Sequence, residues 1–68
     1  MADQQSMQVA ARMRFVSKMQ AFRESVEALP EAGLSAGDMA RWERLLRQKL
    51  AEVELAGHAY QSALSANR

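Results

Sequence analysis

The chain has 68 residues with no cysteine, one histidine, nine basic and eight acidic side chains, which gives a formal net charge of +1. This length allows one domain at most, and without cysteine there are no disulfide bonds or thiol chemistry. Helix-favouring residues such as Ala, Leu, Arg, Glu, Gln and Met predominate, and isoleucine is absent, which argues against strands. We therefore expect one small all-α domain.

The first predicted helix runs from about residue 4 to residue 28. Its apolar side chains recur every three or four residues, the spacing typical of a face packed against another helix. Met7 and Ala11 extend this face towards the start. Pro30 ends the helix, because the residue before a proline is pushed out of helical conformation. The predicted interhelical seam of this helix consists of Phe15, Met19, Phe22, Val26 and Leu29.

A second apolar stripe lies on nearly the opposite side of the first helix, at Val9, Met13 and Val16. A hairpin buries one stripe per helix, so this second stripe needs another explanation. Three interpretations remain open. The stripe is a contact surface for a partner, the first fifteen residues bend away and pack differently, or these are ordinary scattered surface side chains.

The segment from Leu34 to Met39 is a helix-start signal. Ser35 can cap the helix, Asp38 can bond back to Ser35, and Leu34 can pack on Met39 across the cap. A turn is therefore predicted over residues 29–35, and a second helix from about 36 to 64. The seam of this second helix consists of Met39, Trp42, Leu46, Leu50, Val53 and Tyr60, with Gly57 and Leu64 on the same side.

Two helices of similar length and a short turn predict an antiparallel hairpin. Such a hairpin has one mutual interface, which is too small for all the apolar side chains. We expect self-association into a four-helix bundle or docking on another protein. Trp42 either anchors the turn end of the core, which we favour, or serves as a hot spot in an interface. The predicted partner-binding residues are Val9, Met13, Val16, Leu45 and Leu55.

Residues suited to catalysis are scarce. His58 and Glu54 are one turn apart but lack a third metal ligand, and Gly33 and Gly37 do not form a phosphate-binding loop. We expect no enzyme activity, no catalytic, cofactor-binding or metal-binding residue, no cofactor and no small-molecule substrate. Glu43 and Arg47 are spaced for a surface ion pair.

The charges are unevenly distributed. Residues 1–23 hold four basic side chains and one acidic, residues 24–38 hold four acidic and no basic, and the remainder is basic. Arg41, Arg44 and Arg47 recur every three residues, but a DNA-reading helix would also need polar base readers, so only nonspecific contact with nucleic acid is expected. No segment is apolar enough to span a bilayer, and no signal peptide is evident, so a cytoplasmic location is expected.

Two resemblances bear on function. The segment Leu34-Ser35-Ala36-Gly37-Asp38-Met39-Ala40-Arg41-Trp42 followed by Lys49-Leu50-Ala51-Glu52-Val53 resembles the long helix of the Hha/YmoA nucleoid modulators. Arg47-Gln48 stands where that family has Asp-His. This resemblance implies a regulator that acts on DNA indirectly, by binding a nucleoid-structuring protein.

The size, the two-helix plan, Gly37-Asp38 and the nearby Trp42 are similar to the helical-hairpin co-chaperones of type III secretion needle subunits. That similarity implies a cytoplasmic, bacterial partner of a larger chaperone. Neither resemblance assigns a functional residue. The function expected is therefore a non-enzymatic protein-binding adaptor or co-chaperone acting through apolar helix faces, of the kind found in bacterial secretion. The alternative is a small nucleoid-associated or transcription-modulating regulator.

Overall fold

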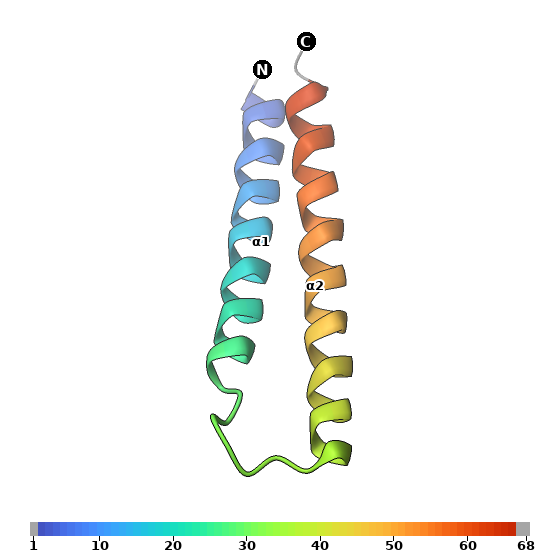
Figure 1. Cartoon of the computed structure of the whole chain (residues 1–68). Helices are drawn as coiled ribbons and strands as arrows, with labels where there is room; N and C mark the ends of the chain where they lie inside the picture. The colour runs from blue at the N-terminus through green and yellow to red at the C-terminus, as the bar shows by residue number, and fades with distance from the viewer. Residues whose placement is uncertain (1, 67–68) are drawn as a thin grey trace.

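The computed structural model describes residues 2–66, with side chains from residue 5, as two α-helices joined by a turn. Helix α1 spans Ala2–Glu27 and helix α2 spans Ala36–Ser65. The helices lie side by side and antiparallel, with the start of α1 and the end of α2 at one end of a rod and the turn at the other (Figure 1). The predicted all-α helical hairpin is confirmed.

The turn follows the last residue of α1, Glu27. α1 ends at Glu27, one residue before the predicted end, and the amides of Ala28 and Leu29 bond back to carbonyls of the last helical turn at 3.0 and 3.2 Å. Pro30 follows and prevents continuation of the helix. Gly33 then takes a φ of +87°, in the left-handed region that glycine adopts without steric cost.

α2 begins with the predicted cap. The backbone of Ser35 is extended, and its Oγ accepts a hydrogen bond from the amide N–H of Asp38 at 3.1 Å. The return bond, from the Ser35 amide to the Asp38 carboxylate, is not formed in the part of the chain that the structure describes. The Asp38 carboxylate nevertheless lies in the first turn, where the helix dipole favours negative charge.

Replacing Ser35 by Ala should lower the free energy of unfolding by about 1 kcal/mol, because an amide at the start of α2 loses its acceptor. The measurement is the unfolding midpoint in urea, followed by circular dichroism. Ser35→Asp is the matched control, since a carboxylate can also cap and should keep the midpoint close to that of the wild type. Equal midpoints for Ser35→Ala and the wild type would show that this cap does not stabilise α2.

The core between the helices is thin. Within residues 5–66 only Val53 and Ala56 are buried, with Val53 7% exposed. Around them the Phe15 ring packs on Tyr60 with centroids 6.2 Å apart, and it lies directly against Gly57. The rod measures 54 × 14 × 12 Å and its radius of gyration is 16.0 Å, against about 11 Å for a compact domain of this length. The hairpin is one layer of structure with both sides open to solvent.

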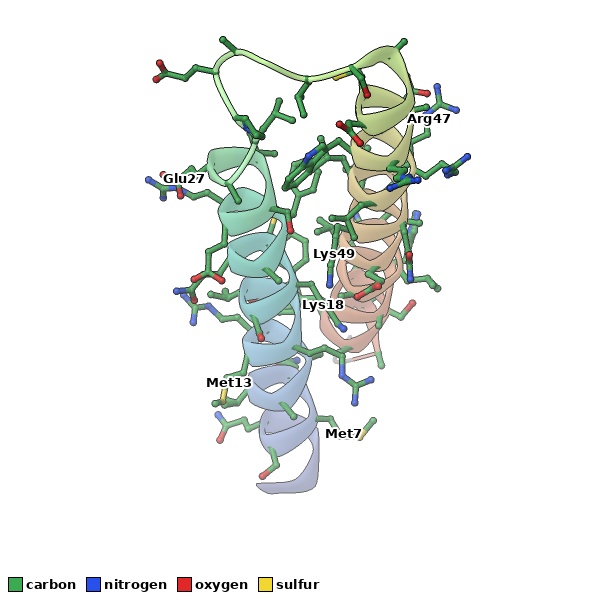
Figure 2. The ribbon with its side chains drawn as sticks, turned by 90° about the horizontal axis from the view of Figure 1, so that it is seen from below. Met7, Met13, Lys18, Glu27, Arg47 and Lys49 are labelled. Atoms are coloured by element: carbon green, nitrogen blue, oxygen red, sulfur yellow. The ribbon has the colours of Figure 1, made fainter. Side chains whose placement is uncertain are left out.

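The side of α1 that faces α2 differs from the predicted seam. Gln8, Lys18 and Ser25 are half-buried there, between the predicted aromatic positions. Gln8 donates to the carbonyl of Ala63 at 3.3 Å, and Figure 2 shows Lys18 on the side of α1 next to α2. Met19 and Val26, predicted for the seam, are 47% and 43% exposed.

On α2, too, the side that faces the other helix differs from the predicted seam. Lys49 is half-buried, whereas Leu50 is 43% exposed and Met39 also lies open to solvent. The predicted seam residues that do face the other helix are Phe15, Phe22, Leu29, Trp42, Leu46, Val53 and Tyr60.

The observed faces differ from the predicted ones because the residues three and four positions after a buried residue both lie near the same face of a helix. With only one neighbouring helix, either the third-position or the fourth-position residues can be buried, but not both. On α1 the third-position residue Lys18 faces α2, where its ammonium pairs with Glu52 while its methylene stem covers apolar surface. The fourth-position residue Met19 is left on the side of the rod.

Candidate functional site

Exposed apolar side chains gather along one side of the hairpin. Met19 and Val26 directly follow Lys18 and Ser25, which face α2. On the other helix Leu50 and Leu64 directly follow Lys49 and Ala63, which face α1. Because the helices are right-handed and antiparallel, the same offset turns all four towards one side. Together with their outward neighbours on α1 they form a surface that we name the apolar flank: Val9, Val16, Met19, Val26, Leu50 and Leu64, all exposed.

The middle of the apolar flank is its most continuous part. Val16, Met19 and Val26 line a shallow groove on α1 together with Phe22, Gln20 and Arg23. Leu50 of α2 lies at nearly the same height as Met19, because neighbouring Lys18 is bonded to Glu52. The apolar groove on α1 therefore has an exposed leucine of α2 at the same height.

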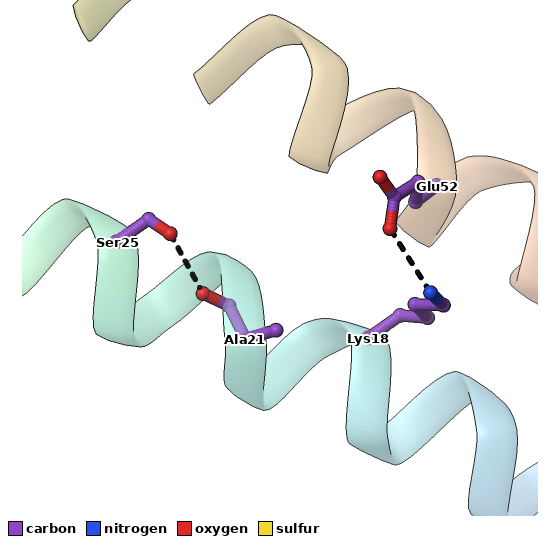
Figure 3. Close-up of polar contacts among 4 residues, drawn as sticks. All are labelled: Lys18, Ala21, Ser25 and Glu52. Carbon is purple, nitrogen blue, oxygen red and sulfur yellow. Dashed lines mark hydrogen bonds and ion pairs between the residues drawn. The ribbon is translucent and has the colours of Figure 1, made fainter. Parts of the chain in front are cut away.

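The opposite side of the hairpin carries an ion pair between the helices. Lys18 Nζ donates to Glu52 Oε1 at 3.0 Å across the two helices (Figure 3), and Arg14 lies beside this pair. Leu55 is exposed next to it, and a shallow groove lined mainly by alanines with Met7 continues to the open end of the rod. The hairpin thus has the apolar flank on one side, and on the other side an ion pair with an apolar groove beyond it.

The ion pair changes the titration of Glu52. The hydrogen bond from Lys18, and then the Lys18 charge, hold the pKa of Glu52 below its ordinary value of 4.5. A carboxyl whose pKa is lowered by folding stabilises the fold above the unfolded pKa, and this contribution is lost as the pH falls through the folded value. Because both side chains are about a third exposed or more, solvent weakens the pair.

Glu52→Gln should therefore reduce the loss of thermal stability that the wild type shows when the pH is lowered below 4.5. At neutral pH the variant should melt at a slightly lower temperature than the wild type. The measurement is the melting temperature by circular dichroism across this pH range. Glu54→Gln is the control, since Glu54 forms no ion pair within the described residues. If both variants show the same acid dependence, the Lys18–Glu52 pair does not contribute to it.

The structure leaves all five predicted partner-binding residues exposed but does not bring all of them together. Val9 and Val16 lie on the apolar flank. Met13 lines a shallow depression with Val9 on the outer face of α1, and Figure 2 shows Met13 pointing to the side opposite Met7. Leu45 is at the turn end, and Leu55, 72% exposed, is on the ion-pair side. These five assignments stay predictions.

Sequence reasoning assigned Met19, Val26 and Leu50 to the seam and so missed them as surface residues. One signal could have found them. Lys18, Ser25 and Lys49 each immediately precede one of the three, so the apolar stripe of each helix is flanked on one side by polar groups. Between only two helices, either these polar residues or the apolar residues that follow them could be buried.

Trp42 sits at the turn end of the rod. It is half-buried and lines a shallow depression with Leu34, Leu45 and Arg41. One part of Trp42 is covered by the hairpin and the rest is open to solvent, so its role in the core or in an interface stays a prediction. Trp42 is separate from the middle of the apolar flank.

Basic side chains do not form one continuous face. Arg23 lines the groove on the apolar flank, Arg14 lies on the ion-pair side, and Lys18 is bonded to Glu52. Arg47 contacts Glu43 at 3.8 Å, which confirms the predicted surface ion pair. Over the described part of the chain no three His, Asp or Glu side chains gather as metal ligands, and neither helix is long and apolar enough to cross a bilayer.

A comparison with protein-family models found no match for this chain, and comparisons with curated proteins and with solved structures found none either. The two resemblances drawn from sequence therefore remain expectations.

Proposed function

We propose that this chain is a non-enzymatic protein-binding module, an adaptor or co-chaperone, that acts through the apolar flank. One observation carries the proposal: polar Lys18 and Ser25 occupy positions between the helices, while apolar Met19 and Val26 beside them face outward. In a hairpin that worked alone, the opposite arrangement would bury more apolar surface and be more stable.

The chemistry of the flank suits a protein partner. Contiguous exposed apolar surface bordered by polar residues is typical of interaction sites. Met19 supplies a flexible, polarizable side chain that adapts to a partner, while the branched Val16 and Val26 are stiff and keep the groove in shape. Arg23, which also lines the groove, can limit which partners fit.

The test is affinity capture from the native cell with tagged wild type, Met19→Asp and Leu55→Asp, followed by mass spectrometry. The wild type and Leu55→Asp should retain a defined protein, either untagged copies of the chain or another protein, that Met19→Asp loses. Both substitutions place a carboxylate at an exposed apolar position, but only Met19 belongs to the apolar flank. Identical sets of retained proteins for all three would overturn the proposal.

A further inference from the structure

We propose that a second copy of this chain covers the apolar flank, and that the two hairpins stack antiparallel into a four-helix bundle. The inference rests on the proposed function and names the partner of the same surface. Three features of the hairpin support it: the amount of surface left open, the symmetry of the flank and the distribution of charge along α1.

The hairpin exposes more surface than a chain of its mass needs to. Its accessible area is 5591 Å², whereas a compact monomer of 7.6 kDa exposes about 4300 Å². The excess of about 1300 Å² exceeds the roughly 800 Å² that each partner contributes to a standard interface. Stacking two hairpins flank to flank converts one open layer into the two packed layers of an ordinary domain.

The flank is suited to meet its own copy. Met19 on α1 and Leu50 on α2 lie at nearly the same height, as the Lys18–Glu52 bond shows. Consider a twofold axis at this height that lies between the two copies and runs perpendicular to the helices. It places α1 of one copy on α1 of the other, and α2 on α2. Met19 then meets Met19 and Leu50 meets Leu50, with Val16 and Val26 on either side of the centre. Both hairpins contribute the same apolar patch, as an isologous interface requires.

Charge selects the antiparallel stack. The first half of α1 is basic and its last turns are acidic, with Arg12 seven residues before Met19 and Glu27 eight residues after it. In an antiparallel stack Arg12 of one copy comes level with Glu27 of the other, twice. A parallel stack would instead lay α1 of one copy on α2 of the other, and Arg12 would not come level with Glu27.

The first test is the mass of the purified full chain by light scattering after size exclusion. The wild type and Leu55→Asp should have the mass of two chains, and Met19→Asp the mass of one with its helical circular dichroism retained. If Met19→Asp does not fold, Met19→Gln replaces it and should also have the mass of one chain. Gln is polar but uncharged and is a good helix former. A wild-type mass of one chain at every concentration, or any mass other than two, overturns the proposal.

The second test is the arrangement, which the absence of native cysteine makes accessible. Gln20 borders the central groove next to the proposed axis, so Gln20→Cys should join two chains through a short bis-maleimide cross-linker. Gln5→Cys is the matched control, since antiparallel stacking puts the two copies of this exposed position at opposite ends. Cross-linking of both variants, or of neither, overturns the antiparallel stack.

The two failures are distinguishable. If the purified chain is a single copy but cells yield another protein that only Met19→Asp loses, the inference fails and the proposed function stands. If the chain is a single copy and no captured protein depends on Met19, both fail.

Discussion

Phe15→Ala should remove about 2 to 3 kcal/mol from the free energy of unfolding, the largest loss we expect from truncating one side chain. The Phe15 ring contacts Tyr60 and Gly57 next to the only buried side chains of the described chain, Val53 and Ala56. Since domains are stable by only about 5 to 15 kcal/mol, this loss is a large fraction of the total, and the unfolding midpoint of the variant should fall clearly. The measurement is urea unfolding by circular dichroism.

Met13→Ala is the matched control for that prediction. It also removes a large apolar side chain from α1, but Met13 lies on the outer face, away from α2 (Figure 2). Its unfolding midpoint should stay close to that of the wild type, because alanine is a good helix former and no cavity is created. If the two variants unfold at the same urea concentration, Phe15 does not hold the helices together.

Gly57→Val should destabilise the hairpin by about 1 to 2 kcal/mol through overpacking. A Cβ at this position would lie 3.1 Å from Cε1 of Phe15, so even one added carbon presses on the ring, and the two methyl groups of valine add to it. The gain in helix propensity on replacing glycine offsets part of this loss. The measurement is the thermal midpoint together with near-ultraviolet circular dichroism, which reports the packing of the aromatic rings.

Gly37→Ala provides the contrast. A Cβ at Gly37 would meet only the Ser35 hydroxyl, at an ordinary 3.9 Å. Alanine there should raise stability by about 0.5 to 1 kcal/mol, because it costs less backbone entropy in a helix. A stabilising effect of Gly57→Val, similar to that of Gly37→Ala, would mean that α1 and α2 do not approach closely at Phe15.

Much of the fold could be predicted from sequence because its signals are local. Ser35 and Asp38 mark the start of α2, and Pro30 fixes the end of α1 to within one residue. These signals depend on backbone geometry and on a side chain within three residues, so they need no knowledge of the rest of the molecule. The pairing of the two helices then follows from the shortness of the turn.

The rotation of each helix about its axis could not be predicted in the same way. Lys18 and Met19 are adjacent, and either could complete a stripe with Phe15 and Phe22 at three- and four-residue spacing. Which of the two faces α2 depends on contacts between the helices, such as the bond from Lys18 to Glu52, which lies 34 residues further along the chain. A contact of this range is not visible in periodicity.

The candidate site was found only in part for the same reason. Val9 and Val16 were identified because they lie off the predicted seam. Leu50 and Val26 were assigned to the seam because they are apolar at seam spacing. Only the observed rotation of the helices shows that Leu50 and Val26, which were assigned to the core, lie on the apolar flank.

The most direct test of the central claim, that the apolar flank is covered by a second copy of this chain, is the melting temperature of the purified chain as a function of its concentration. For an assembly, binding stabilises the folded state by mass action, so the wild-type midpoint should rise steadily with concentration and that of Met19→Asp should stay constant and lower. A sharp wild-type transition that is independent of concentration and coincides with that of Met19→Asp would contradict the account.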